Sequence, residues 1–116
     1  SYDGLDRVLH ERARLGIPAS LAAHHEGLLF NDLKTLCALT DGNLSRHLAV
    51  LGDAGLVEIG RDVTGARPQT KYRLSASGQR RFEAYIAELE KVVMDARRDT
   101  EAHARVNRSR GTWAPA

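Results

Sequence analysis

The segment LTDGNLSRHLAVLGDAGLVEI, residues 39–59, constrains the fold most strongly because it carries both ends and the inward face of one helix. The hydroxyl of Thr40 can cap the helix, and Asp41 in the first turn complements the helix macrodipole. The inward stripe is formed by leucines at the i, i+4 and i+7 spacing, namely Leu44, Leu48 and Leu51. These features predict a short amphipathic helix whose opposite face is polar.

The end of this helix is also specified by the sequence. If Gly55 takes the left-handed conformation after the last turn, Leu51 and Leu56 occupy the two positions whose apolar contact accompanies a Schellman motif. The helix is therefore predicted over residues 40–54. The β-rich residues that follow it predict a strand over residues 56–59.

Upstream residues predict two further helices and a minor strand. The spacing of apolar residues predicts a helix over about residues 5–24, with a kink or a fresh start near Pro18 because proline removes a backbone donor. The apolar run 28–30 predicts a minor edge strand, after which Asn31 is expected to cap a short helix. A tight turn at residues 38–39 then leads into the leucine-striped helix.

A β-hairpin is predicted downstream of that helix. Residues 71–74 alternate in character, with Tyr72 and Leu74 facing one way and two basic residues facing the other, which predicts a second strand. The intervening GRDVTGARPQT, residues 60–70, carries two glycines and one proline among polar residues. This composition predicts the loop of a hairpin.

The C-terminal part of the chain predicts one long helix, which Ser75 caps. Its apolar residues recur at helical spacing: Phe82, Tyr85, Ile86, Leu89, Val92, Val93 and Ala96. The pattern extends to about Val106, or roughly 45 Å at about 1.5 Å per residue, whereas a compact domain of this size has a radius of gyration of about 13 Å. The stripe therefore favours a dimer interface over docking on its own domain. The chain is predicted to divide into a domain over residues 1–96 and a helix end with a frayed basic tail over residues 97–116.

Composition limits the class of protein. A chain of 116 residues and 12.8 kDa has the length of one domain, and its 42% apolar residues can form a small core. The single cysteine, Cys37, cannot form an internal disulfide, and no apolar run approaches about 18 residues, so a soluble cytoplasmic protein is predicted. The trio His24-His25-Glu26 offers adjacent side chains that point apart on a helix, and the Ser, His and Asp residues form no nucleophile elbow. Accordingly, no metal site, cofactor or enzymatic activity is predicted.

The predicted order is helix, tight turn, capped helix and hairpin with a basic loop, which is the order of a winged helix-turn-helix. The expected fold class is thus mainly α with a small β-hairpin. The polar face of the second helix could enter a major groove about 12 Å wide, and its residues are Thr40, Gly42, Asn43, Ser45 and Arg46. The hairpin offers cations to phosphates, namely Arg61, Arg67, Lys71 and Arg73. A net charge of +2 permits such a polyanionic partner without requiring one.

Each residue on the polar face could contribute a contact with DNA bases or phosphates. Arg46 could reach guanine O6 and N7 or a phosphate, and Asn43 could pair with an adenine edge. Ser45 and Thr40 could bond bases or phosphates. Gly42 keeps the helix start slim, so that backbone N–H groups could meet a phosphate.

The runs FNDLKTLCALTDGNLSRHLAVLGDAGLVEI and RPQTKYRLSASGQRRFEAYI resemble winged-helix transcriptional regulators of the MarR/ArsR-like type. The likeness is greatest to the small stand-alone winged-helix DNA-binding proteins, and it covers roughly residues 5–93. It implies a homodimer that is built through terminal helices and binds a pseudo-palindromic operator. By position it also implies that Asn43, Ser45 and Arg46 face the groove.

The same resemblance implies a wing from Arg67 to Lys71, which adds Gln69 to the expected DNA-binding residues. It also implies that a cleft between the long helix and the first helices could accept a small apolar effector. The chain departs from the pattern in two ways. Asp41 would repel phosphates unless it serves the cap, and the paired cysteines of thiolate metal sensors are missing from the sequence.

These observations predict a dimeric, sequence-specific DNA-binding transcriptional regulator, with the helix over residues 40–54 in the major groove. The wing, over about residues 60–71, is expected on the backbone or in the minor groove. The alternative is a winged-helix module that binds another protein through the same polar face or wing, without binding DNA. The wing loop carries three basic residues against Asp62 alone, which favours a polyanion. No membrane association is predicted. The operator, the direction of regulation and the identity of an effector stay open.

Overall fold

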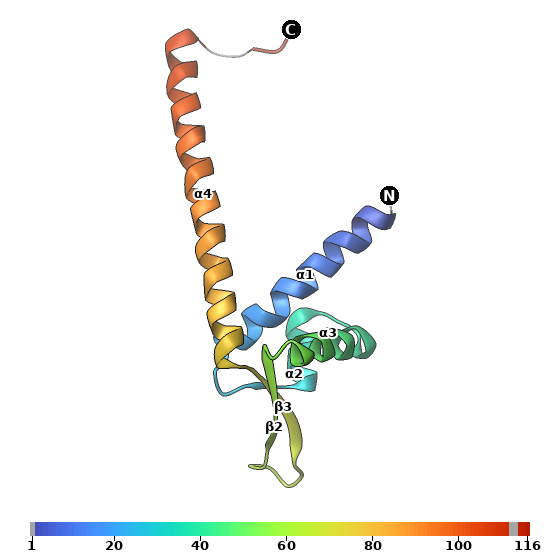
Figure 1. Ribbon diagram of the computed structural model, residues 1–116. Helices are drawn as coiled ribbons and strands as arrows, with labels where there is room; N and C mark the ends of the chain where they lie inside the picture. Colours follow the sequence, from blue (N-terminus) through green and yellow to red (C-terminus); the bar gives the residue numbers. More distant parts are fainter. Residues whose placement is uncertain (1, 112–113) are drawn as a thin grey trace. The chain divides into compact units, whose positions relative to one another are not determined.

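The computed structural model describes the backbone of residues 2–111 and 114–116, with the side chains of residues 13–109, 111 and 114–116. Within this part of the chain, helices and strands follow one another in the order expected for a winged helix (Figure 1). In chain order they are α1 Tyr2–Ala23, β1 Leu28–Leu29, α2 Phe30–Cys37, α3 Asp41–Asp53, β2 Val57–Asp62, β3 Gln69–Leu74 and α4 Ala76–Arg110. The element order confirms the predicted fold class.

Two compact units make up the chain. The first ends at Phe82 and holds the first three helices, the sheet and the first turns of α4. The second begins at Glu83 and holds the rest of α4 with the residues that follow it. The predicted division after residue 96 stays a prediction.

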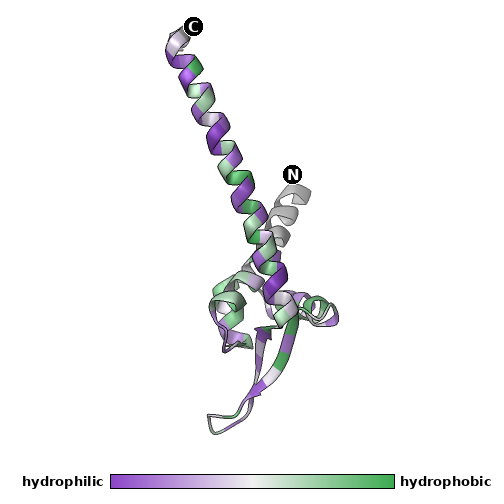
Figure 2. Cartoon of the chain, turned by 60° about the vertical axis from the view of Figure 1, so that its left-hand side comes forward, coloured by the Kyte–Doolittle hydropathy of each residue, from purple (hydrophilic) through white to green (hydrophobic). Residues whose placement is uncertain are grey.

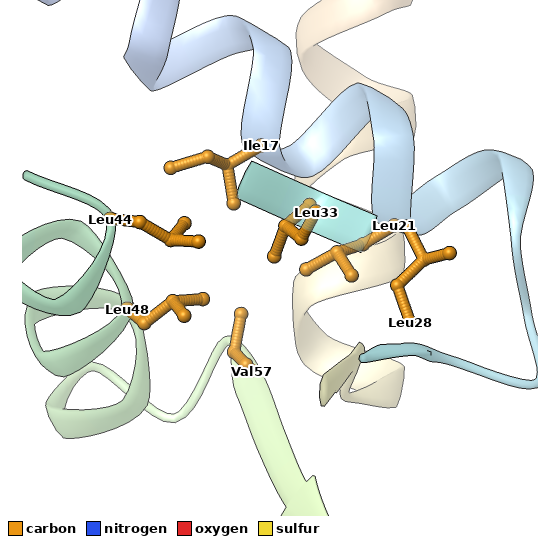
Figure 3. Packing of buried hydrophobic residues seen from close by; sticks show 7 residues of the cluster. All are labelled: Ile17, Leu21, Leu28, Leu33, Leu44, Leu48 and Val57. Atoms are coloured by element: carbon orange, nitrogen blue, oxygen red, sulfur yellow. The ribbon is translucent and has the colours of Figure 1, made fainter. Parts of the chain in front are cut away.

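The core of the first unit is aliphatic and draws on α1, α2, α3 and the ends of two strands. Figure 3 shows its side chains converging on one another. They are Ile17, Leu21, Leu28, Leu33, Leu44, Leu48 and Val57. Burial of one such side chain contributes about 1.5–3 kcal/mol. The leucines of α3 therefore fix that helix firmly against the rest of the unit.

The sheet is antiparallel throughout, with the strand order β1-β3-β2. In the hairpin, Ile59 pairs with Tyr72 and Asp62 pairs with Gln69. This last pair extends both strands beyond their predicted ends, and the connecting loop shortens to residues 63–68. Tyr72 and Leu74 pack against the core, as their alternation predicted.

The structure differs from the prediction for the first helices at two points. Of the kink or fresh start expected near Pro18, the fresh start does not occur, because α1 runs through Pro18 as one helix and the fully buried Ile17 next to it anchors this turn in the core. The kink stays a prediction. Asn31 does not cap α2. That helix follows directly on the paired residue Leu29, which lies in the N-cap position with an extended backbone and no side-chain cap. Asn31 thus lies in the first turn, where its carbonyl accepts a 3.0 Å hydrogen bond from the hydroxyl of Thr35.

The long helix begins and ends on identifiable signals. The Ser75 hydroxyl accepts a hydrogen bond from the Gly78 N–H at 3.0 Å, which confirms the predicted cap. The helix continues four residues past the predicted end at Val106, to Arg110, so the expected frayed tail is helical in its first part. Gly111 follows with φ 102°, a left-handed conformation that stops a helix.

Candidate nucleic-acid interface

A tight turn joins α2 to α3. Ala38 closes α2 in a left-handed conformation, with φ 54°, and the Leu39 N–H donates to the Lys34 carbonyl at 3.1 Å. Thr40 then takes an extended backbone, and its Oγ1 accepts the Asn43 N–H at 3.2 Å. The predicted turn and N-cap are both confirmed, and they place the start of α3 at the surface.

Asp41 has a partner that the sequence did not reveal. Its Oδ1 lies 2.7 Å from Nζ of Lys34, which comes from the last turn of α2. The ammonium group compensates the carboxylate charge at the start of α3. An acidic residue beside phosphates would otherwise repel them, so this ion pair answers the objection that Asp41 raises to a DNA-facing surface.

Helix α3 has one buried face and one exposed face. Leu44 and Leu48 are buried, and Leu51 is half-buried against the same core. The opposite face consists of exposed residues, which are Thr40, Gly42, Asn43, Ser45 and Arg46. The structure thus brings together all the residues predicted to face the groove on this helix, and none of them is covered by the described chain.

The end of α3 has the predicted Schellman geometry. Gly55 has φ 72°, and its N–H donates to the Gly52 carbonyl at 3.0 Å. The Leu56 N–H donates to the Leu51 carbonyl at 2.9 Å. Only a residue without a Cβ adopts this backbone readily, so Gly55 sets where the helix stops and where β2 begins.

The wing is closed by a side-chain turn. Oδ1 of Asp62 accepts hydrogen bonds from Thr64, 2.6 Å from its hydroxyl and 3.0 Å from its backbone N–H. These two bonds, with the nearby charge of Lys71, hold the pKa of Asp62 below its usual value. The aspartate is therefore ionised at neutral pH and orders the start of the loop.

The basic residues of the wing are not equivalent. Arg61, Arg67 and Gln69 are exposed, and neither arginine makes an ion pair within the described residues. Lys71 is half-buried. Arg73 donates from Nε to Oε2 of Glu58 on the neighbouring strand at 2.8 Å, so its charge is already compensated. The two free arginines are thus the strongest candidates for phosphate contact.

An open groove separates α3 from the sheet. Its lining includes Ser45, Ala49 and Asp53 from α3 and Ile59 and Tyr72 from the hairpin, and its volume is about 470 Å³. Because the wing leaves this flank of α3 uncovered, the helix and the wing can approach one partner from two sides.

Among the residues that the structure describes, none outside this surface forms a comparable site. Partial burial raises the pKa of the Cys37 thiol, and the Ser20 hydroxyl 3.7 Å from its Sγ opposes that rise. Nδ1 of His24 lies 2.9 Å from the Ser20 carbonyl. Across the described residues, no group of three or more His, Cys, Asp or Glu side chains is placed to hold a metal ion. None of the described helices combines the length and the apolar character that a membrane span requires.

Known proteins resemble this chain over most of its length. The winged helix DNA-binding domain family matches residues 13–93. This chain belongs to that family. Membership confirms the predicted winged helix-turn-helix and its DNA-binding class.

Two individual proteins show how far the likeness extends. The uncharacterised protein MJ0432 of Methanocaldococcus jannaschii is 40% identical over 60 residues, which are 52% of this chain and 65% of that protein. The chain thus spans just under two thirds of that relative. A transcriptional regulator homologue of Pyrococcus horikoshii has a solved structure that is 28% identical, with a TM-score of 0.64 over 72% of this chain and 81% of its own.

A third likeness concerns the fold alone. The structure of Staphylococcus aureus MepR in complex with DNA covers 91% of each chain with a TM-score of 0.61 and 21% identity. At this identity the similarity shows a shared winged-helix fold.

Proposed function

We propose that this chain is a homodimeric, sequence-specific transcriptional regulator in which α3 enters the major groove of duplex DNA. The observation that carries the proposal is the two-faced character of α3. Leu44 and Leu48 anchor one side in the core, while Asn43, Ser45 and Arg46 stand exposed on the other. Membership of a DNA-binding family and the likeness to a transcriptional regulator homologue support the same reading.

In this proposal the helix specifies sequence and the wing supplies attraction. Arg46 and Asn43 have the donors and acceptors that distinguish guanine and adenine edges in the major groove. Arg61 and Arg67 contact phosphates, which adds affinity without sequence preference. Thr40, Gly42, Gln69 and Lys71 complete the predicted contact surface, whereas Arg73 acts mainly through its ion pair with Glu58.

The dimer presents two copies of α3 to one operator. The apolar stripe of α4, from Phe82 to Ala96, is the proposed contact between the copies. Two recognition helices in a two-fold dimer read half-sites about 34–36 Å apart, which makes the operator pseudo-palindromic. The proposed site of action is the cytoplasm, and the proposal includes no catalytic activity, because the family is defined by DNA binding. A small-molecule effector stays a prediction.

The competing reading is a module that docks another protein through the same surface. The two readings differ in their response to salt. If six to ten phosphates are contacted, affinity falls by about 10³–10⁵ between roughly 50 and 200 mM salt. A direct test is selection of bound sequences from random duplexes at a stated salt concentration, followed by titration of the best duplex across that range. Enrichment of a pseudo-palindrome with steep salt dependence is expected. Failure to retard any duplex at low salt would exclude the DNA-binding proposal.

A further inference from the structure

Helix α3, whose side chains the structure describes in full, exposes one large apolar residue, Val50. Its side chain is 64% exposed, whereas Leu44 and Leu48 on the core side of the helix are 0% and 3% exposed. Figure 2 shows hydrophobic residues recurring among hydrophilic ones along the coloured helices, so hydropathy alone does not single out Val50. Its exposure on the helix that is proposed to enter the major groove does.

Neither core packing nor helix formation accounts for a valine at this position. Val50 takes no part in the core cluster of the first unit. At an exposed helical position valine has a lower helix propensity than alanine, because its branched Cβ loses rotamer freedom against the preceding turn. Its neighbours Asn43 and Arg46 are polar, so Val50 does not belong to an apolar patch of the size that marks a protein-binding surface.

Val50 continues a row of exposed residues that Asn43 and Arg46 begin. The three residues are separated by three and then four positions, which places them on one face of a helix. At about 100° per residue, Val50 lies about 40° from Arg46 and about 20° from Asn43 around the helix axis. A duplex that contacts Asn43 and Arg46 therefore also meets Val50.

The major-groove edges of the base pairs present one kind of apolar group, the C5-methyl group of thymine. The other groups on these edges are hydrogen-bond donors and acceptors, and a valine side chain can bond to neither. Pressing the isopropyl group of Val50 against such atoms would remove their water without replacing its hydrogen bonds. The side chain thus fits a thymine methyl group and disfavours a base edge that lacks one.

We propose that Val50 reads the methyl group of a thymine in each half-site of the operator. The inference rests on the proposed function and adds a specificity-determining residue to it. Val50 lies four residues beyond Arg46, or about 6 Å along the helix axis, and stacked base pairs are about 3.4 Å apart. With α3 aligned along the groove, the thymine lies about two base pairs from the base that Arg46 contacts, on the side away from Asn43.

Ala49 is the other exposed apolar residue of α3 that could meet a methyl group. It lies toward the hairpin, where it lines the open groove together with Ser45 and Asp53. Its single methyl group also reaches less far from the helix axis than the isopropyl group of Val50. The geometry therefore favours Val50, and a Val50 variant separates the two candidates.

Uracil tests the contact directly, because it differs from thymine only in lacking the C5-methyl group. In the duplex that the parent protein selects, each thymine in turn is replaced by uracil in both half-sites, and dissociation constants are measured at one salt concentration. One methyl-sized apolar contact is worth about fourfold, so losing two is expected to weaken parent binding by about fifteenfold. The sensitive thymine should lie about two base pairs from the position that Arg46→Ala relaxes. Val50→Ala should bind the thymine duplex as weakly as the parent binds the uracil duplex, with no further loss on uracil.

Leu36→Ala is the matched control, because Leu36 on α2 is 56% exposed but lies outside the proposed DNA-binding surface. This variant should keep the full effect of uracil. If Val50→Ala also keeps that effect, the methyl group is read by another side chain and the assignment to Val50 is overturned. A selected duplex in which no thymine near the predicted position responds to uracil would overturn the assignment as well, and would leave the proposed function intact. A chain that retards no duplex at low salt would overturn both.

Discussion

Helices α3 and α4 each carry an apolar stripe at helical spacing, and they differ in what covers it. In α3, Leu44 and Leu48 are buried by α1, α2 and the sheet, so the polar face opposite them is held in a fixed orientation. In α4, Leu89 and Val93 remain 44% and 41% exposed. The contrast separates two requirements of a DNA reader. In the proposed function, the reading surface is held by the chain's own core, while the proposed pairing surface stays open for a second copy.

The largest effect is expected from Leu44→Ala, which removes a fully buried side chain beneath the reading surface. Deleting buried leucine atoms leaves a cavity and costs about 2–5 kcal/mol of unfolding free energy. Urea denaturation at fixed protein concentration measures the loss. Val50→Ala is the matched control, because Val50 lies on α3 but is 64% exposed, and its effect should stay within about 0.5 kcal/mol. Equal effects would contradict the two-faced description of α3.

A second variant tests where the long helix leaves the first unit. A Cβ at Gly78 would overlap the carbonyl group of Leu56, the residue just before β2. Gly78→Ala is therefore expected to cost about 1–3 kcal/mol, measured by thermal or urea unfolding. Gly52→Ala, which meets nothing within 4 Å inside α3, should instead stabilise by about 0.5–1 kcal/mol. A neutral Gly78→Ala would show that α4 can shift away from the sheet at little cost.

Leu89→Ala tests the other side of the comparison. Because Leu89 is exposed within its own chain, the truncation should leave the unfolding free energy of the first unit unchanged. It should weaken dimerisation. Two lost side chains per dimer correspond to about a ten- to hundredfold rise in the dimer dissociation constant. Sedimentation equilibrium over a concentration series gives that constant. An unchanged dimer would show that the pairing surface lies elsewhere.

Removing the N-cap of α3 is expected to lower the unfolding free energy by a smaller amount. Thr40→Ala removes the acceptor for the Asn43 N–H and should cost about 1 kcal/mol. Thr100→Ala is the control on α4, where the hydroxyl only bonds back to the Ala96 carbonyl at 2.8 Å, and it should be nearly neutral. Comparable losses in the two variants would argue against a capping role specific to α3.

The smallest expected effect is the dependence of the wing turn on pH, through the ionisation of Asp62. The pKa of Asp62 is lower in the folded wing than in the unfolded chain, chiefly through the hydrogen bond from the Thr64 hydroxyl. Its contribution is therefore fully present above the unfolded pKa and is lost as pH falls through the folded pKa. An NMR titration should show the Thr64 amide resonance moving over that acidic range. Asp62→Asn should abolish the movement, and its persistence would assign the titration to another group.

Local signals in the sequence predicted most of α3 and its surroundings. The Thr40 cap, the leucine stripe and the Gly55 stop each depend on residues within a few positions of one another, so no tertiary information is needed to read them. The set of residues proposed to face the groove follows from the same helix, because its members are the residues that the buried leucines leave exposed.

Features that depend on neighbouring elements were missed. Asn31 looks like a cap in isolation, but the pairing of β1 fixes Leu29 in the N-cap position, so α2 starts two positions earlier than predicted. The Lys34–Asp41 ion pair depends on how sharply α2 turns into α3, and the Glu58–Arg73 pair depends on strand register. The predicted end of α4 was wrong for a different reason. Gly111 follows a polar helical segment and was a stop signal that the sequence showed.

The most direct test of the central claim compares base preference in two variants. Selection from random duplexes is repeated with Arg46→Ala, on the exposed face of α3, and with Lys71→Ala, on the wing. We expect Arg46→Ala to relax preference at one position of each half-site at a cost of about 1–3 kcal/mol, and Lys71→Ala to weaken all sequences alike with a shallower salt slope. If Arg46→Ala changes neither affinity nor preference, α3 does not lie in the groove.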